Sequence, residues 1–123
     1  MKKAFEDKFL AGIDELNSYK EKNHSMYLDV ISDLMYVSNS LKGSSNIVAR
    51  KTINEMIKHW KGISNDIENH CYKMYTVASK IFDVKKENTK EKYVAIFLEL
   101  LDELKEGFKT YEHQYNYNKS ILV

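Results

Sequence analysis

The chain contains no proline, four glycines and one cysteine among its 123 residues. Proline and glycine are the residues that most often interrupt a helix, so their scarcity allows long helices almost anywhere. The single cysteine, Cys71, cannot form an internal disulfide, which agrees with a reducing compartment. Its core-like helical position predicts a small buried side chain and not a reactive thiol.

The chain also lacks an excess of either charge and any long apolar run. Nineteen Lys and Arg nearly balance eighteen Asp and Glu, so no strong field attracts nucleic acid or an anionic membrane. The longest apolar runs, such as Val94–Leu98, are far too short to span a bilayer, and Glu6 and Asp7 lie where a signal peptide needs an apolar core. We therefore expect a cytoplasmic protein with no nucleic-acid or membrane partner.

Apolar residues recur at helical spacing through nearly the whole chain, and no run of strict alternation indicates a strand. A chain of this length is expected to form one domain, residues 1–123. The pattern predicts an all-α fold, most simply an antiparallel four-helix bundle. Its expected helices are roughly residues 2–22, near 26 to near 46, a third whose apolar seam covers 53–81, and a fourth that follows an N-cap at Asn88 or Thr89 and carries its inner stripe over 93–115.

Helix boundaries are predicted from capping residues. Asn23 and Ser25 offer stop and cap chemistry between the first two segments, and Asp83–Thr89 is the clearest linker. The residues expected to face inward are Phe5, Phe9, Ile13, Leu16, Tyr27, Val30, Ile31, Leu34, Met35, Leu41, Ile53, Met56, Trp60, Ile63, Ile67, Cys71, Met74, Ala78, Ile81, Tyr93, Phe97, Leu100, Leu101, Leu104, Phe108, Tyr111 and Tyr115.

The segment 39–49, Asn-Ser-Leu-Lys-Gly-Ser-Ser-Asn-Ile-Val-Ala, has the most unusual composition. On a helix, Asn39, Lys42, Gly43 and Asn46 would share one exposed face. Glycine inside a helix costs about 0.5–1 kcal/mol relative to alanine, which suggests close approach by a partner. Lys42 would place a cation beside any bound anion. These four residues are the predicted partner-binding site.

The string from Leu41 to Ser45 resembles the motif of histidine phosphotransfer (HPt) domains, His-x-Leu-Lys-Gly-Ser-Ser, on the second helix of a four-helix bundle. Ala49 matches the small residue that follows the motif in that family. The layout is similar to that of chemotaxis-kinase phosphotransfer domains, with a longer third helix and an apolar fourth helix. The resemblance implies an HPt-like bundle that docks a response-regulator receiver domain.

Two departures from the family pattern change the expected function. Asn39 stands where the family has its phosphoacceptor histidine, and an amide nitrogen with a delocalised lone pair cannot accept a phosphoryl group. The region that usually supplies an acid to orient that histidine reads Lys58-His59-Trp60-Lys61. The resemblance therefore implies a pseudo-phosphotransfer module in two-component signalling, which is not an enzyme and needs no cofactor.

Other interpretations of these motifs stay open. The Leu-Lys-Gly-Ser-Ser string is also typical of an ordinary helix C-terminus, with Gly43 as the stop signal. Trp60-Lys61-Gly62 resembles the Trp-x-Gly signature of small helical proteins exported by type VII secretion, although it lies inside a continuing apolar seam. An interaction protein unrelated to phosphorelay, such as a secreted substrate of that kind, an immunity protein or a phage factor, is the alternative.

We expect the histidines and the C-terminal tyrosines to have packing or surface roles and not to bind metal or catalyse a reaction. No metal site is expected, and no nucleophile motif or phosphate loop indicates an enzyme. Three tyrosines near the end of the fourth segment indicate either packing or a partner-binding edge. The residues concerned are His24, His59, His70 and His113, and Tyr111, Tyr115 and Tyr117.

Overall fold

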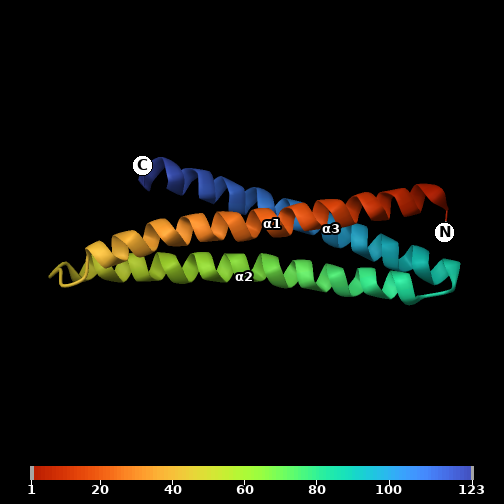
Figure 1. Cartoon of the computed structure of the whole chain (residues 1–123), viewed down its shortest axis with the longest axis horizontal. Helices are drawn as coiled ribbons and strands as arrows, with labels where there is room; N and C mark the ends of the chain where they lie inside the picture. The colour runs from red at the N-terminus through yellow and green to blue at the C-terminus, as the bar shows by residue number, and fades with distance from the viewer. Residues whose placement is uncertain (1, 123) are drawn as a thin grey trace.

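The computed structural model describes the backbone of residues 2–122 and the side chains of residues 2–120. Over this range the chain forms three long helices and no strand: α1 (Lys3–Ser40), α2 (Ile47–Asp83) and α3 (Glu87–Leu122) (Figure 1). The all-α fold class predicted from apolar periodicity is confirmed.

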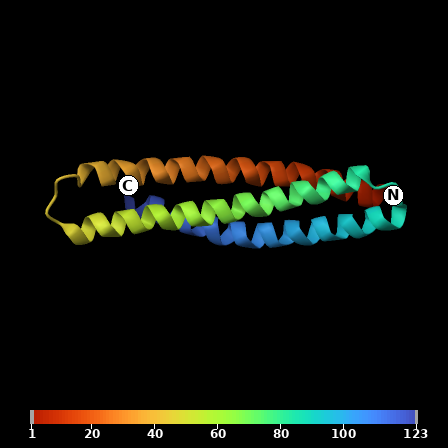
Figure 2. The same cartoon turned by 90° about the horizontal axis from the view of Figure 1, so that it is seen from below.

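The three helices lie side by side, with α2 antiparallel to α1 and α3 (Figures 1 and 2). Both views show α3 ending before it reaches the α1–α2 loop. Near the end of α3, Lys119 Nζ lies 2.7 Å from Asp33 Oδ2, well before α1 ends at Ser40. The last turn of α1, the loop and the first turn of α2 therefore project beyond α3. We call this projecting end, residues 37–50, the tip.

One apolar core runs between the helices. At the crossing of α1 and α3, Gly12 is buried, and a Cβ atom there would lie 2.9 Å from Cε1 of Phe97, so only glycine permits this approach. The predicted inward stripes are largely confirmed, although Met35 is 45% exposed. The largest fully buried side chains are Trp60, Tyr111, Phe9, Phe97, Leu16, Leu34, Met74, Val30, Val94 and Cys71.

Residues 2–122 form three helices where the sequence predicts four. The predicted boundary at Asn23 and Ser25 lies inside α1 and is wrong. Asn23 is only 4% exposed, and its Nδ2 donates a hydrogen bond to the backbone oxygen of Ser64 on α2. Because the Asn23 amide is satisfied by α2, it does not cap a new helix, and no proline or glycine interrupts α1 here.

Two further boundaries differ from prediction. α1 ends at Ser40 and not near Asn46, and α2 begins at Ile47, ahead of the first residue of the predicted seam, Ile53. The second linker is shorter than predicted, because α3 begins at Glu87 and only residues 84–86 are outside the helices. Within residues 2–122, the longer of the two connections between helices is therefore the loop of residues 41–46, which lies at the tip.

Candidate binding site at the tip

The tip loop is built by a helix-ending turn at Gly43. The backbone N–H of Leu41 donates to the carbonyls of Val37 (3.1 Å) and Ser38 (3.2 Å), and that of Ser44 donates to Leu41 (3.0 Å). Gly43 has a φ of 78°, in the left-handed region that favours glycine. The interpretation of the Leu-Lys-Gly-Ser-Ser string as an ordinary helix C-terminus is therefore confirmed for the backbone.

The four predicted site residues do not share a helical face. Asn39 is exposed in the last turn of α1, whereas Lys42 and Gly43 are exposed in the loop. Asn46 caps α2, since its Oδ1 accepts a hydrogen bond from the backbone N–H of Ala49 at 3.0 Å. The prediction of one helical patch was wrong because α1 ends before Lys42.

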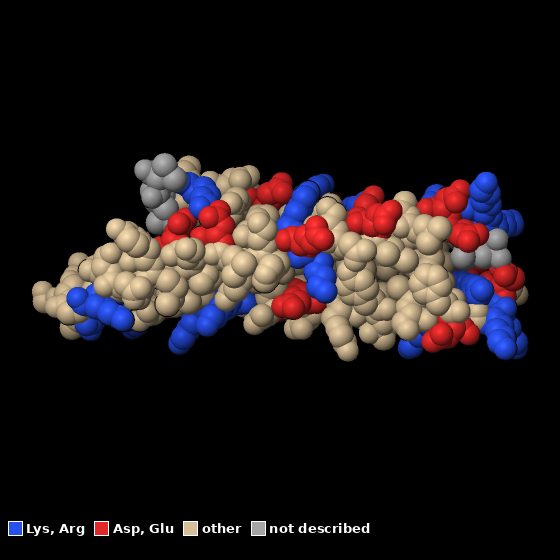
Figure 3. Space-filling model, viewed as in Figure 1, with Lys and Arg blue, Asp and Glu red and all other residues tan. Residues whose placement is uncertain are grey.

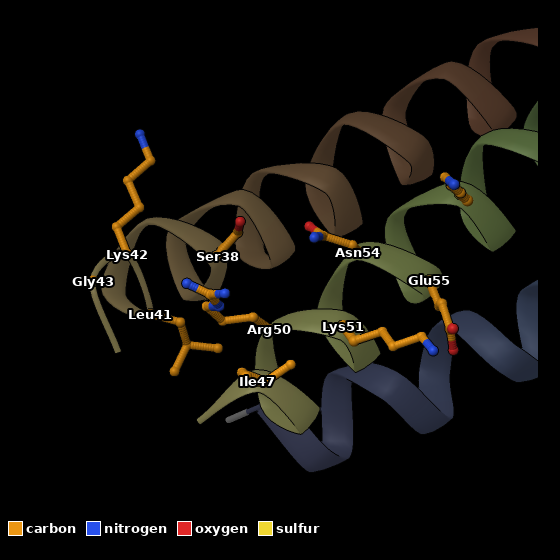
Figure 4. A pocket seen from close by; sticks show the side chains of 10 residues that line it. Ser38, Leu41, Lys42, Gly43, Ile47, Arg50, Lys51, Asn54 and Glu55 are labelled. Atoms are coloured by element: carbon orange, nitrogen blue, oxygen red, sulfur yellow. The ribbon is translucent and has the colours of Figure 1, made fainter. Parts of the chain in front are cut away.

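A groove at the tip lies between the loop residues Lys42 and Gly43 and the first turns of α2; Lys42 borders it, and the end of its side chain points away from the α2 residues (Figure 4). Its volume is about 630 Å³. Leu41 and Ile47 provide apolar surface, and Ile47 is 67% exposed. We call it the tip groove; its lining residues are Ser38, Leu41, Lys42, Gly43, Ile47, Arg50, Lys51, Asn54, Glu55 and Lys58.

The tip groove is cationic. Lys42, Arg50, Lys51 and Lys58 line it with a single acid, Glu55. Among the described residues, none of these four cations has a carboxylate oxygen within 4.0 Å. Figure 3 shows Lys and Arg without Asp or Glu along the lower left edge, where α2 begins. The groove is therefore suited to an acidic ligand surface.

The acids nearest the tip on α1 are engaged by α3. Lys119 Nζ lies 2.8 Å from Asp29 Oδ2 and 2.7 Å from Asp33 Oδ2, and the hydroxyl of Tyr115 donates to Asp29. The hydrogen bonds from Lys119 and Tyr115 lower the pKa of Asp29, and those to the two carboxylates raise the pKa of Lys119. No other charged residue lies between His24 and Lys42, so α1 does not neutralise the groove.

Sequence reasoning identified Lys42 and Gly43 but missed Arg50, Lys51 and Lys58 as lining residues. The signal was present in the charge distribution. Residues 34–62 contain five Lys or Arg and one acid, a net charge of +4 in a chain of net charge +1. A search for local charge asymmetry would have pointed to this end of the molecule.

A second hollow, of about 590 Å³, lies between α2 and α3 and includes the two histidines His59 and His113. His59 Nε2 lies 3.4 Å from Oε1 of Gln114. His70 is half-buried, and its Nε2 lies 2.7 Å from the carbonyl oxygen of Leu100. The described His, Cys, Asp and Glu side chains form no group of three that could hold a metal ion. The histidines thus lie at surfaces and helix interfaces, as predicted.

The three C-terminal tyrosines have different environments. Tyr111 is buried with 1% exposure, and Tyr115 is half-buried and bonds Asp29. Tyr117 is 63% exposed on the rim of the second hollow. Packing therefore accounts for Tyr111 and Tyr115, and the partner-binding edge stays a prediction that concerns Tyr117 alone.

Comparison of the chain with protein-family models, curated proteins and solved structures found no match. In the described part of the chain, no helix combines the length and the apolar character that crossing a membrane requires. Function is therefore inferred from the geometry and charge of the tip groove.

Proposed function

We propose that this protein is a non-catalytic binding module that engages an acidic surface of a protein partner through the tip groove. The observation that carries the proposal is the set of four cations, Lys42, Arg50, Lys51 and Lys58, that have no carboxylate partner among the described residues. An acidic partner would relieve the repulsion between these cations and gain electrostatic steering. Exposed Ile47 beside them offers apolar contact.

A response-regulator receiver domain is the narrower candidate partner. Its acidic pocket would face Lys42, with Asn39 and Gly43 exposed at the same end. Asn46 would contribute indirectly, by capping the first turn of α2. Because the amide of Asn39 cannot carry a phosphoryl group, such binding would be a pseudo-phosphotransfer role in two-component signalling. An HPt-like four-helix bundle would need one helix beyond the three that the structure describes.

The alternative is an interaction protein unrelated to phosphorelay. Gly43 favours it, because its left-handed backbone ends a helix, whereas the HPt motif lies on a continuous helix. Within this alternative, an exported Trp-x-Gly protein is the least supported, since Trp60 is buried in the middle of α2 and Gly62 is helical. The proposal places either role in the cytoplasm, supported by a lone buried Cys71.

The test is calorimetric titration of the chain with purified receiver domains from the same organism. We expect Lys51→Glu/Lys58→Glu to weaken binding about tenfold or more. The matched control is Lys85→Glu/Lys86→Glu in the α2–α3 loop, at the far end of the bundle, which should leave the affinity unchanged. Equal affinity of the tip variant and the wild type would overturn the tip groove as the binding site.

A second arm tests the receiver itself. An Asn39→His variant is incubated with each phosphorylated receiver, and phosphate on the variant but not on the wild type would support an HPt-derived surface. If no receiver binds the wild type or transfers phosphate to the variant, the receiver candidate falls and the unrelated interaction protein remains.

A further inference from the structure

The middle of α3 carries an acidic stretch that the tip groove does not contact. Its members are Glu99, Asp102, Glu103 and Glu106, and all four are exposed. Of these, Glu106 alone has a base within ion-pair distance among the described residues, Lys109 at 3.3 Å on the same helix. Helical spacing places the stretch away from the buried Leu100, Leu104 and Phe108. Asp102 and Glu106 also line a hollow that includes Lys22 of α1.

The spacing of this stretch matches that of the tip groove. Lys51 and Lys58 are separated by seven residues, as are Glu99 and Glu106, which is about 10.5 Å along a helix axis in both cases. An exposed isoleucine precedes each pair by about one turn, Ile47 in the groove and Ile96 on α3. If α3 of another copy lay parallel to α2, Glu99 and Glu106 would lie opposite Lys51 and Lys58. Ile96 would then lie beside Ile47.

From this match we propose that the tip groove binds the acidic stretch of α3 of a second copy of this chain. The inference rests on the proposed function and names its partner. Charge complementarity is its main support, because residues 34–62 carry a net charge of +4 and the remainder of the chain carries −3. The added helix would lie against the end of the α1–α2 hairpin, as a fourth helix beside the three that the structure describes.

The contact is heterologous. The tip groove is lined by α1, α2 and their loop, whereas the acidic stretch lies on α3. One contact therefore leaves an unused groove on one copy and an unused acidic stretch on the other. Head-to-tail contacts of this kind propagate into chains of increasing length unless the geometry closes a ring. Association should thus grow with concentration and should not stop at a dimer.

Analytical ultracentrifugation of the full chain tests the proposal. At about 0.01 M salt, where the Debye length is about 30 Å, we expect oligomers whose mean mass rises with concentration. At about 1 M salt, where it is about 3 Å, we expect monomers. A chain that stays monomeric up to about 1 mM at low salt would overturn the proposal.

Charge reversal identifies the two surfaces. We expect Lys51→Glu/Lys58→Glu and Glu99→Lys/Glu106→Lys each to be monomeric alone, because the first variant is acidic on both surfaces and the acidic stretch of the second has lost its net negative charge. An equimolar mixture of the two should form a complex again, since the unchanged groove of one variant then meets the unchanged acidic stretch of the other. The control Lys85→Glu/Lys86→Glu should assemble as the wild type does. Association of either reversed variant by itself, or none in the mixture, would overturn the pairing.

These outcomes separate the inference from the proposed function. The wild type could be monomeric but bind a receiver domain, and Lys51→Glu/Lys58→Glu could abolish that binding. This result would refute the second copy as the partner and would support the tip groove as a binding site. If that variant changes neither self-association nor receiver binding, both the proposed function of the tip groove and its binding of a second copy are refuted.

Discussion

Asn23 and Ser64 form a reciprocal hydrogen-bonded pair across the buried interface of α1 and α2. Asn23 Nδ2 donates to the Ser64 backbone oxygen at 3.2 Å, and Ser64 Oγ donates to Asn23 Oδ1 at 3.2 Å. The two residues are 4% and 6% exposed. Since a shift of either helix would leave these polar groups buried and unpaired, the pair fixes the register of α1 against α2.

Replacing Asn23 tests that role. We expect Asn23→Leu to lower the free energy of unfolding by about 1–3 kcal/mol, because the Ser64 hydroxyl is left buried without its acceptor. Adding Ser64→Ala should recover part of the loss by removing that hydroxyl. The measurement is urea unfolding followed by circular dichroism. Asn65→Leu, at an exposed neighbouring position, is the control and should change stability by less than about 0.5 kcal/mol. Equal effects at both positions would contradict the register role.

The buried faces could be predicted from sequence, but helix continuity at Asn23 could not. Each helix must bury one apolar stripe, so the spacing of Ile67, Cys71 and Met74 is readable locally. Asn23, with Ser25 two residues later, has the local chemistry of a helix end. Its partner lies 41 residues away on α2. Only the tertiary structure shows that the amide is satisfied there and that α1 continues.

Two glycines should respond in opposite directions to alanine. Gly43→Ala is expected to lower the free energy of unfolding by about 1–2 kcal/mol, because a Cβ atom disfavours a φ of 78°. Gly62→Ala should raise it by about 0.5–1 kcal/mol, since Gly62 is helical and a Cβ there meets no heavy atom within 4 Å. Thermal unfolding of both variants is the measurement. A stabilising Gly43→Ala would refute the left-handed turn.

The candidate site was only partly predictable, because its residues come together only in the tertiary structure. Lys42 and Gly43 stand out because their motif is local and unusual. Arg50, Lys51 and Lys58 join them only after Gly43 reverses the chain and α2 begins at Ile47, so their shared groove depends on where α1 ends. The sequence analysis placed the end of this helix near Asn46. With the whole motif on one helix, no groove between the loop and α2 was expected.

The hydroxyl of Tyr111 is buried without a hydrogen-bond partner among the described residues. The ring packs against Trp60 and Phe108, with centroids 5.4 and 5.7 Å away. Tyr111→Phe keeps this packing and removes the unpaired group, so we expect the free energy of unfolding at neutral pH to rise by about 1 kcal/mol. Chemical denaturation is the measurement. A loss of stability would show that the hydroxyl has a partner.

The same residue predicts a response to alkaline pH. Burial raises the pKa of Tyr111 from 10.0 to about 12, so the folded state favours the neutral phenol. The free energy of unfolding of the wild type is therefore unaffected by this ionisation well below pH 10 and falls as pH rises from 10 towards 12. The stability difference between Tyr111→Phe and the wild type should therefore widen by about 2 kcal/mol over that interval. Tyr72→Phe, at a position 74% exposed, is the control for the removal of a tyrosine hydroxyl.

Lys119 joins the end of α3 to α1 through Asp29 and Asp33. In Lys119→Gln we expect faster hydrogen exchange of the amides of residues 112–120 and unchanged exchange of those of 94–104, because the carboxylates lose their cation while the core stays packed. Mass spectrometry of the exchanged chain is the measurement. Lys109→Gln, which removes an ion pair within α3 alone, is the control and should not loosen residues 112–120.

Acid should have the same effect on the wild type. The pKa of Asp29 is lowered by Lys119 and Tyr115, so the folded state favours the carboxylate. The contribution of this carboxylate to the stability of the folded state is present above pH 3.8 and is lost as pH falls below that value. Once intrinsic exchange rates are corrected for pH, the end of α3 in the wild type should then approach the exchange seen in Lys119→Gln. An end of α3 that stays equally protected in acid would show that apolar contacts, and not this carboxylate cluster, hold it against α1.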